Sequence, residues 1–173
     1  RISADHPLWP GARLYDLYEQ AHTPWSWHHS GFALARELGI EAFSSPFDKT
    51  ATDFLEEFDP PAYKIASLEI VDLPLITYVA SKGRPVIISA GTANAAEVCA
   101  AVEAARQGGA SDVVVLQCTS SYPAEPRDAN LRTIPALAAQ LDVAVGLSDH
   151  TMGIGVSIAA VALGARVIEK HFT

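Results

Sequence analysis

Long apolar runs and cysteines are scarce in this sequence, and each shortage excludes a class of protein. No hydrophobic stretch approaches the roughly 20 residues that a membrane-spanning helix needs, and no basic and apolar leader opens the chain. The two cysteines, Cys99 and Cys118, have neither CxxC spacing nor the number that a disulfide framework requires. We therefore expect a cytoplasmic protein with two reduced, mostly buried thiols and no structural zinc site.

Positive charge is also in short supply. The sequence has 12 lysines and arginines against 20 aspartates and glutamates, which gives a formal net charge of −8. This balance is unfavourable for nucleic acid or an anionic membrane, so neither is expected as a partner. A small anionic ligand stays compatible, because local cations decide its binding. With 173 residues, 49% of them hydrophobic, the chain can form one domain with a substantial core.

Short apolar stretches alternate with helical ones along the chain. Residues 1–20 predict a long loop that enters a short helix. We expect strands at 40–43, 62–66, 85–88, 113–116, 143–151 and 165–173. We expect helices at 25–38, from 48 or 50 to 57, and at 72–81, 94–107, 131–140 and 153–163. Such alternation implies parallel strands joined by right-handed crossovers.

Two architectures fit this alternation, an open doubly wound sheet and a (β/α)₈ TIM barrel. No GxGxxG motif follows a strand, which argues against dinucleotide binding. Polar side chains end every expected strand, as in barrels that gather their site from many strands. A TIM barrel needs eight strands and about 250 residues. We therefore expect an α/β protein that is an incomplete barrel fragment with about six of the eight strands.

The clearest polar strand end lies in 143–151, VAVGLSDHT, where an apolar run breaks into Ser148, Asp149 and His150. The stretch 165–173 repeats this design and ends in Glu169, Lys170 and His171. If the two strands are parallel neighbours about 5 Å apart, their imidazoles can converge on one ion. Either histidine alone is more simply a structural residue. Both together, beside Asp149 and Glu169, predict a site.

Serines stand at the ends of five of the expected strands: Ser45, Ser67, Ser89, Ser120 and Ser148. Taken singly, each serine is more simply a helix cap or a turn residue. Together with Lys64 they form a set of hydroxyls around one ammonium group, which suits phosphate. Lys64 lies inside an apolar strand, where an unpaired lysine is costly. The alternative for Lys64 is an internal ion pair with Glu69 or Asp149.

Six segments, in order along the chain, carry a resemblance to a known family: FSSPFD (43–48), PAYKIAS (61–67), VIISAG (86–91), QCTSSYP (117–123), GLSDHT (146–151) and EKHFT (169–173). On these motifs the chain resembles the sialic acid synthases. The segment LYDLYEQAHTPWSWH (14–28) resembles their pseudaminic and legionaminic acid branch. The resemblance implies a (β/α)₈ barrel followed by a small antifreeze-like domain, in a homodimer.

The resemblance also implies an activity and its residues. The family condenses phosphoenolpyruvate with an N-acetylated amino sugar, here a 2,4-diacetamido-2,4,6-trideoxyhexose, into a nine-carbon nonulosonic acid. Phosphoenolpyruvate binding falls on Ser45, Lys64, Ser67, Ser89, Ser120 and Ser148. His150 and His171 become ligands of a divalent metal, Mn²⁺ with Mg²⁺ or Co²⁺ as alternatives. Glu169 becomes a catalytic glutamate beside that metal, and the sugar contacts are Tyr122 and Asp16.

Departures from the family pattern leave alternatives open. The family's STGM reads SAGT at 89–92, and the histidine of its LHCT motif is Gln117. The family's first two strands and its antifreeze-like domain are absent, so we expect 1–173 to be a partial TIM-barrel synthase domain. The alternatives are an N-acetylneuraminate synthase acting on N-acetylmannosamine, another phosphoenolpyruvate-dependent ulosonate synthase, a non-catalytic phospho-ligand-binding fragment and a Schiff-base aldolase built on Lys64.

Overall fold

The computed structural model describes residues 1–5 and 9–172, and the chain divides into two compact units, Arg1–Ala42 and Phe43–Thr173. The first unit holds helix α1 (Leu14–Ala21) and helix α2 (Trp25–Leu38). Helix α2 ends at Gly39, whose φ of 68° is the left-handed conformation that glycine adopts readily at this position. The predicted helix at 25–38 is therefore confirmed. All three tryptophans of the sequence lie in this unit, and all are exposed.

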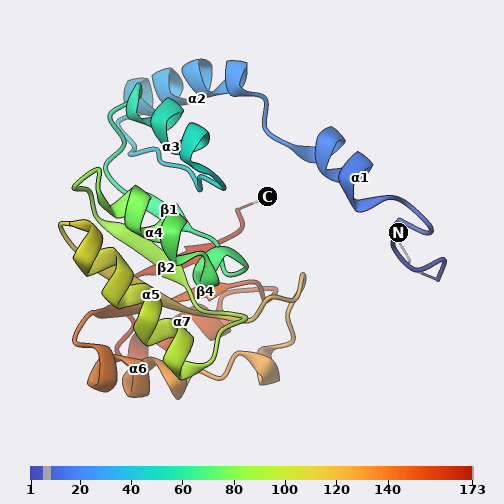
Figure 1. Ribbon diagram of the computed structural model, residues 1–173. Helices are drawn as coiled ribbons and strands as arrows, with labels where there is room; N and C mark the ends of the chain where they lie inside the picture. The colour runs from blue at the N-terminus through green and yellow to red at the C-terminus, as the bar shows by residue number, and fades with distance from the viewer. Residues whose placement is uncertain (6–8, 173) are drawn as a thin grey trace. The chain divides into compact units, whose positions relative to one another are not determined.

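Strands and helices alternate through the second unit (Figure 1). Its strands are β1 (Tyr63–Ile65), β2 (Val86–Ser89), β3 (Val113–Cys118), β4 (Ala144–Asp149) and β5 (Ile168–Lys170). Its helices are α3 (Lys49–Glu56), α4 (Leu73–Ala80), α5 (Ala95–Gly108), α6 (Thr133–Leu141) and α7 (Gly155–Ala162), with 3-10 turns at Glu69–Val71 and Pro126–Asp128. The strands form one parallel sheet in the order β1-β2-β3-β4-β5. Neighbours in sequence are thus neighbours in space, as in a barrel.

One expected strand is missing. The segment 40–43 has no strand, so the described residues hold five strands rather than about six. A single backbone hydrogen bond, from the N–H of Lys64 to the carbonyl of Ser44 at 3.3 Å, links the following residues to β1. A ladder needs a repeating series of such bonds. Ile40 and Phe43 are also exposed, so the burial that the apolar run implied does not occur here.

Helix caps fix where each strand-to-helix loop ends. Asp48 accepts a hydrogen bond from the N–H of Ala51 at the start of α3. Asp72 accepts one from the N–H of Leu75 at the start of α4. A capping box between Asn94 and Glu97 begins α5. These caps confirm the predicted starts of the three helices. Because all strands are parallel, the loops from strand to helix lie at the carboxyl edge of the sheet. Within the described ranges, no helix is long and apolar enough to cross a bilayer.

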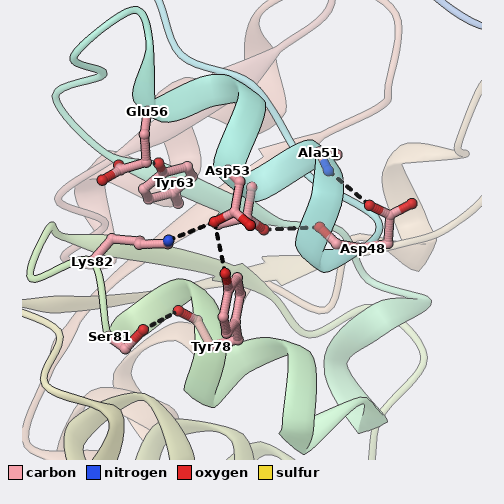
Figure 2. Close-up of polar contacts among 9 residues, drawn as sticks. Asp48, Ala51, Asp53, Glu56, Tyr63, Tyr78, Ser81 and Lys82 are labelled. Atoms are coloured by element: carbon pink, nitrogen blue, oxygen red, sulfur yellow. Dashed lines mark hydrogen bonds and ion pairs between the residues drawn. The ribbon is translucent and has the colours of Figure 1, made fainter.

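Polar contacts hold α3 against its neighbours (Figure 2). Asp53 on α3 accepts hydrogen bonds from the hydroxyl of Tyr78 and the ammonium of Lys82, both at 2.6 Å. The hydrogen bond from Lys82 is the main reason why the pKa of Asp53 lies below its usual value. On β1, the buried Tyr63 donates to Glu56 of α3. These contacts tie α3 to α4 and β1 at the outer side of the sheet.

Gly146 allows β4 to approach the residues before β5. A Cβ atom at this position would overlap the carbonyl oxygen of Val167 and lie 2.8 Å from the side chain of Leu116. Because a backbone oxygen in a sheet cannot move aside, we expect Gly146→Ala to lower the free energy of unfolding by about 1–3 kcal/mol. Urea denaturation of the intact protein measures this. Gly155→Ala is the control, since nothing lies within 4 Å of its Cβ. Equal stability of the two variants would contradict the prediction.

Candidate active site

A continuous row of polar contacts crosses the carboxyl ends of four strands. Lys64 of β1 donates from Nζ to Oγ of Ser89 on β2 at 2.8 Å, and its Nζ lies 3.7 Å from Oε2 of Glu169 on β5. Ser148 of β4 donates to Oε1 of Glu169 at 2.6 Å. Oγ of Ser148 also lies 3.3 Å from Nε2 of His150. Five predicted site residues from distant parts of the sequence are thereby brought together.

Lys64 is buried, with 7% of its surface exposed. Its Nζ also donates to the carbonyl of Ile65 at 3.1 Å, so three acceptors surround the three hydrogens of the ammonium group. Burial lowers the pKa of Lys64, and the charge of Glu169 opposes this shift. The sequence offered Glu69 or Asp149 as the internal partner of Lys64. Lys64 does form an internal ion pair, but its partner is Glu169 and neither of the two residues that this alternative named.

The two predicted metal-binding histidines lie side by side. Their ring centroids are 5.3 Å apart, and the ring of Tyr122 packs against both, at 4.1 Å from His150 and 5.6 Å from His171. Nδ1 of His150 lies 2.9 Å from the carbonyl oxygen of Thr119. Because a carbonyl only accepts, Nδ1 donates to it, and Nε2 is the ring nitrogen that faces Ser148 and the site. Burial is the main reason why the pKa of Tyr122 is raised.

Carboxylates do not complete a larger metal cluster around these histidines. Among residues 1–5 and 9–172, no group of three or more histidine, cysteine, aspartate or glutamate side chains is arranged to hold a metal. The candidate metal ligands are therefore the two imidazoles. Glu169 lies near them, because Ser148 contacts both Glu169 and His150.

Asp149 is held apart from the histidines by its own hydrogen bonds. It is 2% exposed, and its carboxylate accepts from the backbone N–H and hydroxyl of Thr151, from Ser157 and from Lys170. Burial alone would raise the pKa of Asp149, but the hydrogen bonds from Ser157, Lys170 and Thr151 lower it to about 2. The sequence grouped Asp149 with the histidine site. The structure instead pairs its carboxylate with Lys170, because successive residues of a strand point to opposite faces.

Two more predicted serines meet beside the row. The hydroxyls of Ser67 and Ser120 are 2.8 Å apart. A Cβ atom at Gly91 would lie 2.5 Å from Oγ of Ser120 and 2.9 Å from Sγ of Cys118, so glycine leaves the room that Ser120 occupies. Cys118 is buried as expected, whereas Cys99 is only half-buried.

The last two predicted residues lie outside these contacts. Ser45 is half-buried in the extended segment before α3, next to Ser44, whose carbonyl binds the backbone of β1. Asp16 lies on α1 in the first unit, where its carboxylate is 3.8 Å from Arg13.

A cavity of about 400 Å³ opens beside the histidines. Its walls include Tyr122, His150, Thr151, Met152, Lys170 and His171. This volume lies within the range of about 300–1,000 Å³ that is usual for small-molecule sites.

Sequence reasoning missed two residues that hold the site in place. Thr119 acts through its backbone carbonyl, for which no side-chain signal exists. Ser157 binds Asp149 from α7, and its only signal is a lone hydroxyl in an apolar helix.

These features define a class of fold and site: an α/β half-barrel of five parallel strands whose polar side chains gather at the carboxyl ends of the strands. The chain belongs to the NeuB family, whose model matches residues 2–173.

Similar proteins agree with this assignment. The chain is 47% identical over 165 residues to a pseudaminic acid synthase of Campylobacter jejuni, covering 95% of this chain and 48% of that one. It is 43% identical over 150 residues to an N,N'-diacetyllegionaminic acid synthase of Legionella pneumophila, covering 84% of this chain and 42% of that one. The chain thus spans about half the length of the curated relatives it matches.

A solved structure shows the same fold. The N-acetylneuraminic acid synthetase of Leptospira borgpetersenii, in complex with citrate, matches with a TM-score of 0.86 at 35% identity, over 91% of this chain and 55% of that one. The predicted resemblance to sialic acid synthases and the predicted barrel class are therefore confirmed.

Proposed function

We propose that this chain forms the barrel part of an enzyme that condenses phosphoenolpyruvate with an N-acetylated amino sugar, giving a nine-carbon nonulosonic acid and free phosphate. The observation that carries the proposal is the row of contacts from Lys64 through Glu169 and Ser148 to His150. This row places a cation, a carboxylate and an imidazole at one edge of the sheet. The names of the similar proteins support the same reaction.

Lys64 and the serines suit the anionic substrate. Phosphoenolpyruvate carries a phosphate and a carboxylate, and a buried ammonium gives such groups strong charge-assisted hydrogen bonds. Ser89 already contacts the ammonium of Lys64, and the hydroxyls of Ser67 and Ser120 contact each other. Hydroxyls can turn from such mutual contacts to a bound anion, because each is both a donor and an acceptor. Ser45 and Ser148 complete the proposed set.

His150 and His171 would hold the divalent ion, Mn²⁺ in our proposal. The residues fit such an ion, since Nδ1 of His150 faces the carbonyl oxygen of Thr119, Nε2 points toward Ser148 and the ring of His171 lies beside it. Imidazole nitrogens bind many first-row divalent ions, whereas Mn²⁺ prefers oxygen ligands, so Glu169 and water would supply the oxygen donors of the proposed site. When bound, the ion would supply a Lewis acid to the aldehyde oxygen of the open-chain sugar.

The remaining chemistry needs one proton acceptor. Carbon 3 of phosphoenolpyruvate bonds to the aldehyde carbon, the C=O π bond opens and the aldehyde oxygen takes up a proton to become a hydroxyl. A water oxygen adds to carbon 2. The resulting carbon 2 hydroxyl then loses its proton and becomes the ketone as the bond between carbon 2 and the phosphate oxygen breaks. Glu169 accepts the proton of that water. Ser148 donates to Oε1 of Glu169 and orients it, while the ammonium of Lys64 lies 3.7 Å from Oε2. Tyr122, whose ring faces both imidazoles, and Asp16 are proposed to contact the sugar.

The choice of sugar gives a direct test. Because the chain is 47% identical to a pseudaminic acid synthase, we expect the intact protein to prefer a 2,4-diacetamido-2,4,6-trideoxyhexose to N-acetylmannosamine. The two sugars differ in an acetamido group, and pocket residues that bind its amide lose their hydrogen-bond partners when the other sugar is bound. The resulting loss of transition-state stabilisation is at least that of a missing methylene, so we expect at least about a tenfold ratio of kcat/KM. Competition between the two sugars at fixed phosphoenolpyruvate measures this ratio. A ratio that favours N-acetylmannosamine would assign the protein to the ordinary sialic acid branch.

A further inference from the structure

Asp149 and Lys170 form an ion pair that the proposed chemistry leaves unused. Asp149 lies opposite Lys170 in the register of β4 and β5, and Ser148 lies opposite Glu169. Ser148 and Glu169 contact each other within the row of site residues. Since side chains alternate along a strand, Asp149 and Lys170 occupy the other face, where Ser157 of α7 binds the same carboxylate.

Each histidine directly follows one member of this pair. His150 comes after Asp149, and His171 comes after Lys170. The separation of the two imidazoles therefore depends on how the strand ends are held at this point.

Lys170 joins the two strand ends on both sides of His150. Its Nζ donates to Oδ2 of Asp149 at 2.9 Å and to the carbonyl oxygen of Thr151 at 2.7 Å. One ammonium group thus binds the residue before His150 and the residue after it. Asp149 closes the same turn from within, because its Oδ1 accepts from the backbone N–H and the hydroxyl of Thr151.

The charges of Asp149 and Lys170 compensate each other in a largely buried place, so removing one leaves the other without a partner. The side chain of Asp149 is fully buried and that of Lys170 is 26% exposed. A buried charge that loses its partner is not rescued by water, so the surrounding backbone has to rearrange. Here that backbone carries His150.

We infer that Asp149 and Lys170 are positioning residues for the two histidines: their ion pair fixes the backbone on either side of His150 and holds its ring 5.3 Å from that of His171. The inference rests on the proposed function, in which these histidines bind a divalent ion. Lys170 also lies in the wall of the cavity beside the histidines, but the role inferred here for both residues acts through the backbone around His150.

Binding of Mn²⁺ alone tests this without any turnover. In the intact protein, Asp149→Asn and Lys170→Gln are each expected to weaken Mn²⁺ affinity by about 10–100-fold, the loss usual for residues that orient metal-binding histidines. The double variant is expected to lose no more than either single variant, because both changes break one interaction. The electron paramagnetic resonance signal of the free ion reports the affinity.

Three further variants keep the test decisive. Ser157→Ala removes one hydrogen bond to Asp149 and leaves both charges in place, so it is expected to fold and to show a smaller loss in the same direction. Lys170→Arg keeps the charge and is expected to restore part of the affinity lost in Lys170→Gln. Asp53→Asn breaks the ion pair between Asp53 of α3 and Lys82, which lies in the turn after α4, and is expected to leave Mn²⁺ affinity unchanged.

The outcomes separate the inference from the proposed function. Unchanged Mn²⁺ affinity in Lys170→Gln and Ser157→Ala, measured beside a His150→Ala variant that no longer binds the ion, overturns the inference alone. Binding of Mn²⁺ that persists in His150→Ala overturns the metal site and the inference together.

Discussion

Alanine at His150 or at His171 is expected to abolish nonulosonic acid formation and to weaken Mn²⁺ binding by more than about 100-fold, beyond the loss usual for residues that only orient such ligands. The two imidazoles are the nitrogen donors of the proposed site, and their rings lie 5.3 Å apart. Removing one leaves a single nitrogen and no carboxylate cluster in the described part of the chain to replace it. Calorimetric titration with Mn²⁺ measures the affinity, and circular dichroism checks the fold.

A matched variant separates metal binding from ring packing at this place. Tyr122→Phe keeps the ring that packs against both imidazoles and removes only the hydroxyl, so its Mn²⁺ affinity is expected to equal that of the unaltered protein. If His150→Ala or His171→Ala also kept full affinity, the histidine concerned would have a packing role against Tyr122 instead.

Lys64→Met is expected to raise the KM for phosphoenolpyruvate by roughly 10–150-fold, since hydrogen bonds to charged groups contribute about 1.5–3 kcal/mol. Methionine has a similar length and packs in a buried strand, but it carries no charge. Lys82→Met is the control, because Lys82 lies in the turn after α4, pairs with Asp53 of α3 and is expected to leave the KM unchanged. Steady-state kinetics of the intact proteins measures both values. An unchanged KM in Lys64→Met would remove Lys64 from the phosphoenolpyruvate site.

Borohydride trapping asks whether the same lysine reacts covalently. Burial lowers the pKa of Lys64, which a Schiff-base lysine needs, but Glu169 opposes this shift. The three acceptors around Nζ match a charged ammonium, so we expect borohydride added during turnover to leave Lys64 unmodified in mass spectra. A reduced adduct on Lys64 would make the aldolase alternative the better one.

The sequence predicted the strand ends well because their residues have local signals. Asp48, Asp72 and Asn94 are typical helix caps, and each begins a helix where it was expected. Apolar runs that end in serine, lysine or histidine predicted β1, β2, β4 and β5, the four strands whose ends carry the row of contacts. The convergence of His150 and His171 follows from the parallel pairing of β4 and β5.

Other features depend on three-dimensional relations that no local pattern records. The alternative partners of Lys64 in the sequence were Glu69 and Asp149, whereas in the structure its ammonium pairs with Glu169, which lies on β5, distant in sequence. The alternation of side chains along β4 was a usable signal, since it places Asp149 on the face opposite Ser148. The predicted strand at 40–43 is wrong for another reason. Its apolar composition suggested a buried strand, but Ile40 and Phe43 are exposed.

The placement of the tryptophans gives the two units different optical properties. Trp9, Trp25 and Trp27 all lie in the first unit, whereas the aromatic phenols of the second unit are Tyr63, Tyr78 and Tyr122. Fluorescence excited selectively in the indole band therefore arises from residues 1–42 alone. Near-ultraviolet circular dichroism in the phenol band includes the buried Tyr63 of the sheet. The intact chain thus carries a built-in reporter by which the melting of its first 42 residues can be followed apart from the melting of the sheet.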